Sequence, residues 1–200
     1  MRATFATLLT TVLLLGTAPA SSAPIVVDFE GLADQSALTT QVPGLTFAGA
    51  VVLDSRASLN VFEAPPASGF AAVINGSDGA VSIDFATLVN SVSARFTYFE
   101  RVTVTAFGPG SSPLGTVSSL FDRNFTSSGT GSPNELITIS ATSGISRVTF
   151  ATAPSTVAET FVFDDLTYDS NPTRVPEPGT LALLGIGLAG LAVARRRRAG

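Results

Sequence analysis

Apolar and polar residues alternate in short runs over residues 25–168, and no long stretch repeats every 3.6 residues. Val92, Ala94, Phe96 and Tyr98 alternate with polar residues, which is the pattern of a strand with one buried face. Clusters rich in Gly, Pro, Asn and Ser separate the runs and are typical of turns. The predicted strands are 25–29, 45–47, 51–53, 71–74, 81–85, 92–98, 102–106, 114–119, 136–140, 145–151 and 161–168.

Short strands at this spacing predict an all-β fold, an antiparallel β-sandwich of the jelly-roll type. The apolar content of the middle of the chain is sufficient for one two-layer core. We expect this domain to span 21–170 and to be followed by a short polar linker at 171–174.

The composition narrows the chemistry that this domain can perform. The sequence has no Cys, His or Trp, and all 11 basic residues are Arg. A disulfide framework, thiolate chemistry, most zinc sites and the usual serine or cysteine triads are therefore excluded. Oxygen ligands remain, and these suit calcium. Residues 21–174 carry a formal charge of about −8, which argues against a nucleic-acid partner.

The first twenty residues read as a secretory signal peptide that forms a short helix. Arg2 precedes an apolar run at 8–15, and Ala18 and Ala20 form a small-x-small cleavage site. Cleavage after Ala20 is favoured over cleavage after Ala23, because the latter would leave a proline at the new N-terminus. Eight apolar residues reach only about 12 Å, too short for a permanent membrane anchor.

Residues 175–200 contain three consecutive elements. A Pro-containing motif at 175–179 excludes helix. The uncharged stretch 180–194 predicts a transmembrane helix of about 22 Å, which snorkelling Arg side chains can extend toward the roughly 30 Å hydrocarbon core. The basic end should stay cytoplasmic, so the domain would lie across the inner membrane. The motif begins Val175, Pro176, Glu177 and Pro178, and the basic cluster is Arg195, Arg196, Arg197 and Arg198.

This order of Pro-Glu-Pro, Gly/Leu/Ala-rich span and terminal Arg cluster resembles the PEP-CTERM sorting tail of Gram-negative bacteria. The resemblance implies recognition by a membrane-embedded exosortase, which cleaves near the motif. It also implies an association with exopolysaccharide and biofilm production. The predicted partners are thus signal peptidase, the exosortase, the inner membrane through 180–194, and exopolysaccharide.

The middle of the chain resembles exported β-sandwich domains of the galactose-binding-like type. The resemblance is carried by Val-Asp-Phe-Glu-Gly-Leu at 27–32, Gly-Leu-Thr-Phe at 44–47 and Phe-Val-Phe-Asp-Asp-Leu-Thr-Tyr at 161–168. In lectin-like jelly rolls the first and last strands often lie side by side, and carboxylates from both can meet a structural calcium ion.

Four carboxylates are therefore candidate calcium ligands. Asp28 and Glu30 lie two apart on a predicted strand and would share one face. Asp164 or Asp165 could complete the set, but adjacent strand residues point to opposite faces, so only one would contribute. The alternative is that these side chains are solvated or cap neighbouring turns.

The sequence also offers candidates for two further kinds of site. Glycan binding needs exposed aromatic rings, and Phe121 and Phe125, in a polar stretch, are the candidates, with buried hairpin packing as the alternative. Hydrolysis would need two neighbouring carboxylates as acid and base, and Asp28 with Glu30 is the one clear pair of this kind. No nucleophile elbow or phosphate-binding glycine loop accompanies them.

The sequence thus favours a non-catalytic exported protein of the envelope or extracellular matrix, anchored transiently in the inner membrane through its tail. A calcium-stabilised carbohydrate-binding module is the alternative, and a glycoside hydrolase is disfavoured. No cofactor is predicted apart from the possible structural calcium.

Overall fold

The computed structural model describes residues 23–76, 79–152 and 160–170, together with residues 185, 187, 188 and 195. Residues 22–171 form a compact unit of their own. The predicted signal helix, the linker, the sorting motif and nearly all of the stretch 180–194 lie outside the described residues. Among the residues that are described, no helix is long and apolar enough to cross a membrane.

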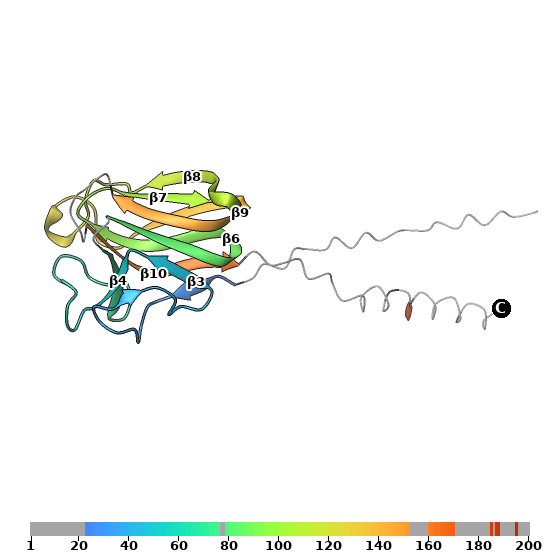
Figure 1. The fold of residues 1–200 in the computed structure, drawn as a ribbon, viewed down its shortest axis with the longest axis horizontal. Helices are drawn as coiled ribbons and strands as arrows, with labels where there is room; N and C mark the ends of the chain where they lie inside the picture. Colours follow the sequence, from blue (N-terminus) through green and yellow to red (C-terminus); the bar gives the residue numbers. More distant parts are fainter. Residues whose placement is uncertain are drawn as a thin grey trace, which may run out of the picture. The chain divides into compact units, whose positions relative to one another are not determined.

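The unit is built from antiparallel strands, as the alternating pattern predicted, and the all-β sandwich is confirmed (Figure 1). Two short 3-10 turns, η1 (Pro109–Ser111) and η2 (Thr126–Ser128), lie in its loops. The strands are β1 (Ile25–Val27), β2 (Ala37–Leu38), β3 (Leu45–Ala48), β4 (Ala50–Asp54), β5 (Ala71–Asn75), β6 (Ala80–Tyr98), β7 (Val102–Phe107), β8 (Pro113–Ser118), β9 (Glu135–Thr152) and β10 (Phe161–Ser170).

Two long strands, β6 and β9, belong to both layers of the sandwich. The first half of β6 and the second half of β9 pair with each other, β3 flanks β6, and β7 with β8 flank β9. The second half of β6 and the first half of β9 form the other layer with β10, β5, β4 and β2, and β1 also pairs with β10.

Register shifts explain why the sequence pattern breaks each long strand in two. In β6, Val81 and Ile83 are buried, whereas farther along Val92 and Ala94 are buried, so the buried positions change from odd to even. The pairing of β6 with β9 shifts register on both sides of Val89. A bulge that inserts an unpaired residue moves the apolar set to the other side of the strand, so a strict period-two pattern predicts two strands where one exists.

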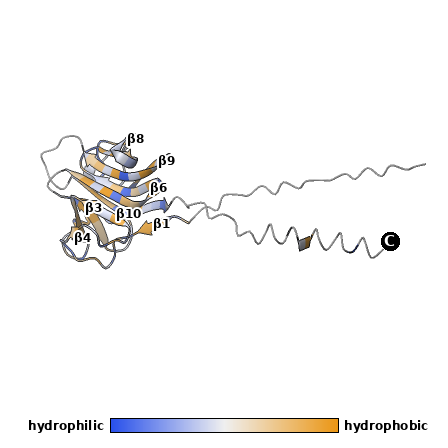
Figure 2. Ribbon diagram, turned by 45° about the vertical axis from the view of Figure 1, so that its right-hand side comes forward, coloured by the Kyte–Doolittle hydropathy of each residue, from blue (hydrophilic) through white to orange (hydrophobic). Residues whose placement is uncertain are grey.

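The main core lies between the layers and is rich in aromatic rings. Phe96 packs edge-on against Phe150 across the sandwich at 5.0 Å between centroids, and Phe150 packs against Phe163 at 5.1 Å. All three side chains are buried. The alternation of apolar and polar residues along these strands is visible in Figure 2. Core packing thus explains half of the 14 Phe residues, namely Phe29, Phe47, Phe85, Phe96, Phe150, Phe161 and Phe163.

A second, smaller core lies on the outer side of β5 and β10. Leu59 and Ala64, in the segment 55–70 between β4 and β5, pack against Ala72, Ile74 and Val162. Every residue of β5 is buried, because the main core covers one face and segment 55–70 covers the other. The sequence indicated strands with one buried face and did not predict this second layer of packing.

The tight connection between β3 and β4 offers a test of this packing. Gly49 has φ +74°, and a Cβ there would lie 2.3 Å from the carbonyl oxygen of Ala80. Gly31 has a similar φ of +78°, but a Cβ at that position would meet no other atom within 4 Å. Gly31→Ala should cost about 1 kcal/mol through backbone strain alone, and Gly49→Ala should cost at least ~2 kcal/mol because the backbone must also move. Urea unfolding of both variants measures the difference, and equal losses would contradict the close approach.

Candidate functional site

The long connection 119–134 between β8 and β9 is held by a buried asparagine. The side chain of Asn124 accepts a hydrogen bond from the backbone N–H of Tyr98 (2.7 Å) and donates to the carbonyl oxygens of Phe96 and Ser132 (both 2.9 Å). The Asn124 backbone N–H also donates to the Tyr98 carbonyl (3.0 Å). These bonds satisfy the buried backbone at the end of β6 and fix where the connection lies.

A tyrosine and a glutamate fix the first part of the same connection. The Tyr98 hydroxyl donates to the Glu135 carboxylate, and the other carboxylate oxygen accepts from the N–H of Leu120 (2.8 Å). Burial, and then the hydrogen bond to Glu135, raise the pKa of Tyr98 to about 12. The hydroxyl therefore stays protonated at neutral pH and acts as a fixed donor, while Leu120 and Phe121 are held at the surface.

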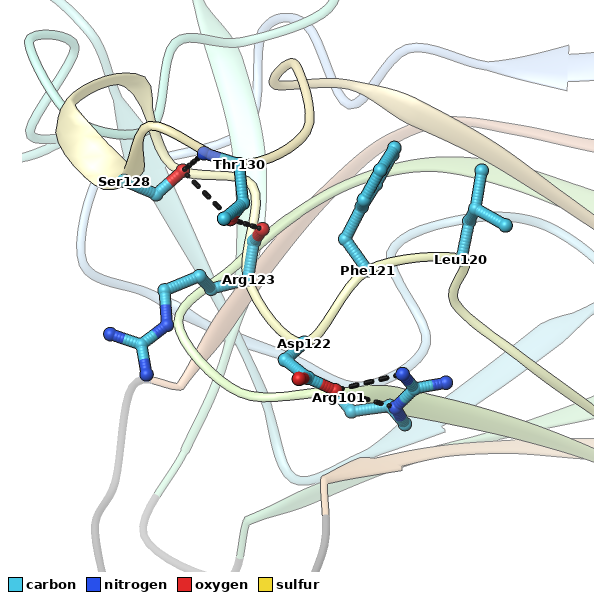
Figure 3. A pocket seen from close by; sticks show the side chains of 7 residues that line it. All are labelled: Arg101, Leu120, Phe121, Asp122, Arg123, Ser128 and Thr130. Carbon is cyan, nitrogen blue, oxygen red and sulfur yellow. Dashed lines mark hydrogen bonds and ion pairs between the residues drawn. The ribbon is translucent and has the colours of Figure 1, made fainter.

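A cavity of about 560 Å³ opens beside this connection (Figure 3). Arg101 donates to Asp122 Oδ1 from Nη2 (2.7 Å) and Nε (3.1 Å), and to the Ser119 carbonyl (3.1 Å). In Figure 3 the side chains of Leu120 and Phe121 point the same way, away from the ion pair. The lining residues, called the loop-end site below, are Arg101, Leu120, Phe121, Asp122, Arg123, Ser128 and Thr130.

The loop-end site combines exposed apolar surface with polar groups. Leu120 is 72% exposed and Phe121 is 36% exposed, which is high for large apolar side chains. Both arginines supply donors, and the hydroxyls of Ser128 and Thr130 can donate or accept. An apolar ring face beside hydroxyl, guanidinium and carboxylate groups suits a ligand with apolar C–H faces and many hydroxyl groups.

Segment 55–70 packs against the connection that carries the loop-end site. The Glu63 carboxylate accepts from the Ser127 backbone N–H (3.1 Å) and hydroxyl (2.8 Å), and the Glu63 carbonyl accepts from the Thr126 N–H (2.9 Å). Asn134 donates to the Pro66 carbonyl (3.3 Å). Segment 55–70 and the connection 119–134 are therefore joined by direct hydrogen bonds.

The two Phe residues proposed for glycan contact have different surroundings. Phe121 is exposed at the loop-end site, and its ring lies so close to Gly131 that a Cβ there would be 2.5 Å from it. Phe125 is half-buried and stacks on Phe99 at 4.6 Å. The sequence did not single out Arg101, Leu120 or Asp122, because the ion pair joins residues 21 apart and no local pattern marks it.

The predicted calcium ligands do not have the arrangement expected from alternation along strands. β1 ends at Val27, so Asp28 and Glu30 follow the strand and do not lie on it as expected. The expectation that Asp164 and Asp165 point to opposite faces is also wrong. The pairing of β10 with β6 shifts register between Asp164 and Thr167, and Asp165 has φ +51°. This irregularity lets both aspartates reach Ser68.

Protein donors contact all four of these carboxylates. Asp164 accepts from the backbone N–H groups of Ala67 (2.8 Å), Ser68 (2.9 Å) and Asp165 (2.7 Å), and Asp165 accepts from the Ser68 hydroxyl (2.7 Å). Glu30 accepts from the N–H groups of residues 70 (2.6 Å) and 71 (2.8 Å). Asp28 accepts a hydrogen bond from the backbone N–H of residue 30 (3.2 Å).

The described residues contain no group of three or more His, Cys, Asp or Glu able to hold a metal ion. Calcium binding by this set stays a prediction, and their observed contacts are those of turn caps.

Asp164 is the buried carboxylate that anchors segment 55–70. Burial raises its pKa to about 6, and the three N–H donors partly oppose that rise. The folded state therefore binds a proton more tightly than the unfolded chain, whose carboxyl has a pKa near 3.8. The stability that follows from this difference is fully present below about pH 4 and is lost as the pH rises through about 6.

We expect wild type to lose about 2 kcal/mol of unfolding free energy relative to an Asp164→Asn variant between pH 4 and pH 7. The variant also loses the hydrogen bond to the Asp165 N–H, but that cost does not depend on pH. Urea unfolding at both pH values measures the difference, with Asp122→Asn as the control because the Asp122 side chain is 81% exposed. A difference between wild type and Asp164→Asn that is the same at both pH values would contradict this assignment.

The sorting residues predicted from the sequence, Val175 to Pro178 and the arginines at 196–198, lie outside the described residues, as do Ala18 and Ala20. Arg195 is described and has helical backbone geometry.

Comparison with known proteins confirms the sorting tail. Residues 174–198 match the PEP-CTERM protein-sorting motif. The motif implies that the protein is exported, is anchored in the membrane through its C-terminal tail, and is processed by an exosortase. No curated protein matches the chain.

Several solved structures are similar to the domain in fold. The K2 cleaved adhesin domain of Lys-gingipain is 14% identical with a TM-score of 0.49, and the match covers 73% of this chain and 99% of that one. A DUF4465 family protein from Bacteroides caccae is 13% identical with a TM-score of 0.45, covering 75% and 100%. A family 29 carbohydrate-binding module complexed with mannohexaose is 11% identical with a TM-score of 0.40, covering 74% and 91%. The ligands in these names belong to those proteins.

Proposed function

We propose that this exported β-sandwich is a non-catalytic protein of the cell envelope or extracellular matrix that binds exopolysaccharide at the loop-end site. The observation that carries the proposal is the exposure of Leu120 and Phe121 beside the Arg101–Asp122 ion pair. A polysaccharide offers ring faces that pack on apolar side chains and hydroxyls that bond to guanidinium, carboxylate and hydroxyl groups. The sorting tail supports the proposal, because its motif implies that the domain is exported and anchored in the membrane.

A binding role accounts for these contacts better than a hydrolytic one. Asp28 accepts the N–H of Glu30, and the Glu30 carboxylate accepts two backbone N–H groups from the start of β5. Two carboxylates used in this way hold turns. At the loop-end site, the Asp122 carboxylate is paired with Arg101, and no second carboxylate is among the lining residues.

The binding proposal is tested by co-sedimentation of the segment 21–174 with exopolysaccharide purified from the host. Both cores lie within this segment, and residues 22–171 are a compact unit. Phe121→Ala should weaken binding about tenfold, equivalent to ~1.4 kcal/mol, because the exposed ring face is lost. Leu136→Ser is the control, since Leu136 is also exposed but is not among the residues that line the loop-end site.

Unchanged binding by Phe121→Ala, with normal binding by the control, would place the polysaccharide elsewhere on the domain. Absence of binding by the wild-type segment would overturn the proposed ligand. Release of reducing ends from the polymer would overturn the non-catalytic assignment. The assay is run with calcium and with chelator, so that any dependence on calcium is measured directly.

Processing at both ends is part of the same proposal. We place signal-peptide cleavage after Ala20, and exosortase cleavage near the motif at 175–179, after which 180–200 stays behind in the membrane. The mature chain should therefore begin at Ser21 and lack residues 180–200. Mass spectrometry of the protein isolated from host cells and from their medium measures both ends. An intact C-terminus in the mature pool would contradict the processing step.

A further inference from the structure

Strand β6 has a bulge near its middle, in its pairing with β10. Val89 and Ser91 are both paired, and Ser91 lies opposite Ser140 of β9 and Asp169 of β10. Asn90, between them, has no partner in either ladder. Opposite β10, Ser91 and Val89 pair with the consecutive residues Asp169 and Ser170, so Asn90 is the inserted residue of a bulge on β6. Bulges of this kind re-aim a side chain, and here the side chain is a polar amide.

Two oxygen atoms at this bulge are buried without a hydrogen-bond partner. They are Asn90 Oδ1 and Asp169 Oδ1, and they are the buried side-chain nitrogen or oxygen atoms in the described residues for which no partner is found. Burying such an oxygen without a partner costs on the order of 1–3 kcal/mol, and more for a carboxylate. Because both residues line the same cavity, we infer a bound group that both oxygens contact.

The same two residues line a cavity of about 370 Å³. Ser91, Ser140 and Thr142 add hydroxyl groups to its wall, and Ser140 donates to Ser91 (3.2 Å). The donor set is thus one carboxylate, one amide oxygen and several hydroxyls, all of them hard oxygen ligands. The lining residues are Asn90, Ser91, Ser140, Ala141, Thr142 and Asp169.

We propose that Asn90 and Asp169 hold a divalent cation, with Ca²⁺ as the ion that this oxygen set fits best. A sugar ring fits less well, because the two oxygens expose almost no surface that a bulky group could contact. Zinc is disfavoured because the cavity offers no nitrogen or sulfur ligand. Backbone carbonyls and water would complete the six to eight oxygens that Ca²⁺ takes. A site with a single carboxylate should be weak, with a dissociation constant of about 0.1–1 mM, as in extracellular modules.

This site differs from the carboxylate set that the sequence suggested. Glu30, Asp164 and Asp165 already accept hydrogen bonds from protein donors, whereas Asn90 Oδ1 and Asp169 Oδ1 do not. Asp169 is next to the last residue of β10, from which the chain continues to the sorting tail at 174–198. A bound cation would tie the end of β10 to β6 and so secure the last strand of the exported domain. The inference does not depend on the loop-end site.

The test uses Tb³⁺ as a luminescent substitute for Ca²⁺, with the full chain purified in a non-ionic detergent. The chain has no Trp and two Tyr, and Tyr168 adjoins Asp169, so tyrosine excitation should sensitise Tb³⁺ bound at this site. Saturable emission that Ca²⁺ displaces is expected. Asp169→Asn should weaken Tb³⁺ binding at least tenfold, and Asn90→Ala at least threefold. Asp164→Asn, which alters the other carboxylate set, should bind Tb³⁺ like wild type.

Thermal unfolding supplies a second measurement that does not rely on tyrosine. Millimolar Ca²⁺ should raise the Tm of wild type and of Tyr168→Phe, but not that of Asp169→Asn. The proposal is overturned if Ca²⁺ up to about 10 mM leaves the wild-type Tm unchanged, which would mean an internal water only. It is equally overturned if Asp169→Asn binds Tb³⁺ as wild type does, or if Asp164→Asn is the variant that loses binding.

Discussion

The burial of both faces of β5 and β10 is the constraint on which the rest of the domain depends. Val73 and Phe163 face the main core, and Ile74 and Val162 face outward from the same strands. Leaving that outer apolar face in water would forfeit several kcal/mol of burial, so segment 55–70 must lie across it. The segment carries backbone N–H groups of its own, and these need partners once they are near an apolar surface.

A buried aspartate meets that need, and its position follows from an irregularity in β10. The register shift after Asp164 brings two consecutive carboxylates to the residue pair 67–68, where a regular strand would bring one. Glu30 likewise accepts hydrogen bonds from the backbone N–H groups at the start of β5. Carboxylates that would suit a cation are thus used to position a loop, and the energetic cost of burying Asp164 is reflected in its raised pKa.

The positioned segment in turn supports the loop-end site. Glu63 bonds to Ser127, and Asn124 joins the connection to the end of β6, so the exposed side chains Leu120 and Phe121 stand on a fixed backbone. A rigid backbone reduces the entropy that a ligand must overcome on binding. The bulge in the middle of β6 has a separate consequence, since it aims Asn90 at a polar cavity beside Asp169.

The sequence by itself determined the parts that depend on local pattern. Alternation such as Val92, Ala94 and Phe96 established antiparallel strands and the sandwich, and the order of elements in 174–198 established the sorting tail. Only the tertiary structure decided which carboxylates are used as caps and where oxygen atoms are left without partners. The physical reason is that these contacts join distant residues, as between Ala67 and Asp164, 97 positions apart. They also depend on bulges, which shift a strand by one residue and leave no trace in a period-two pattern.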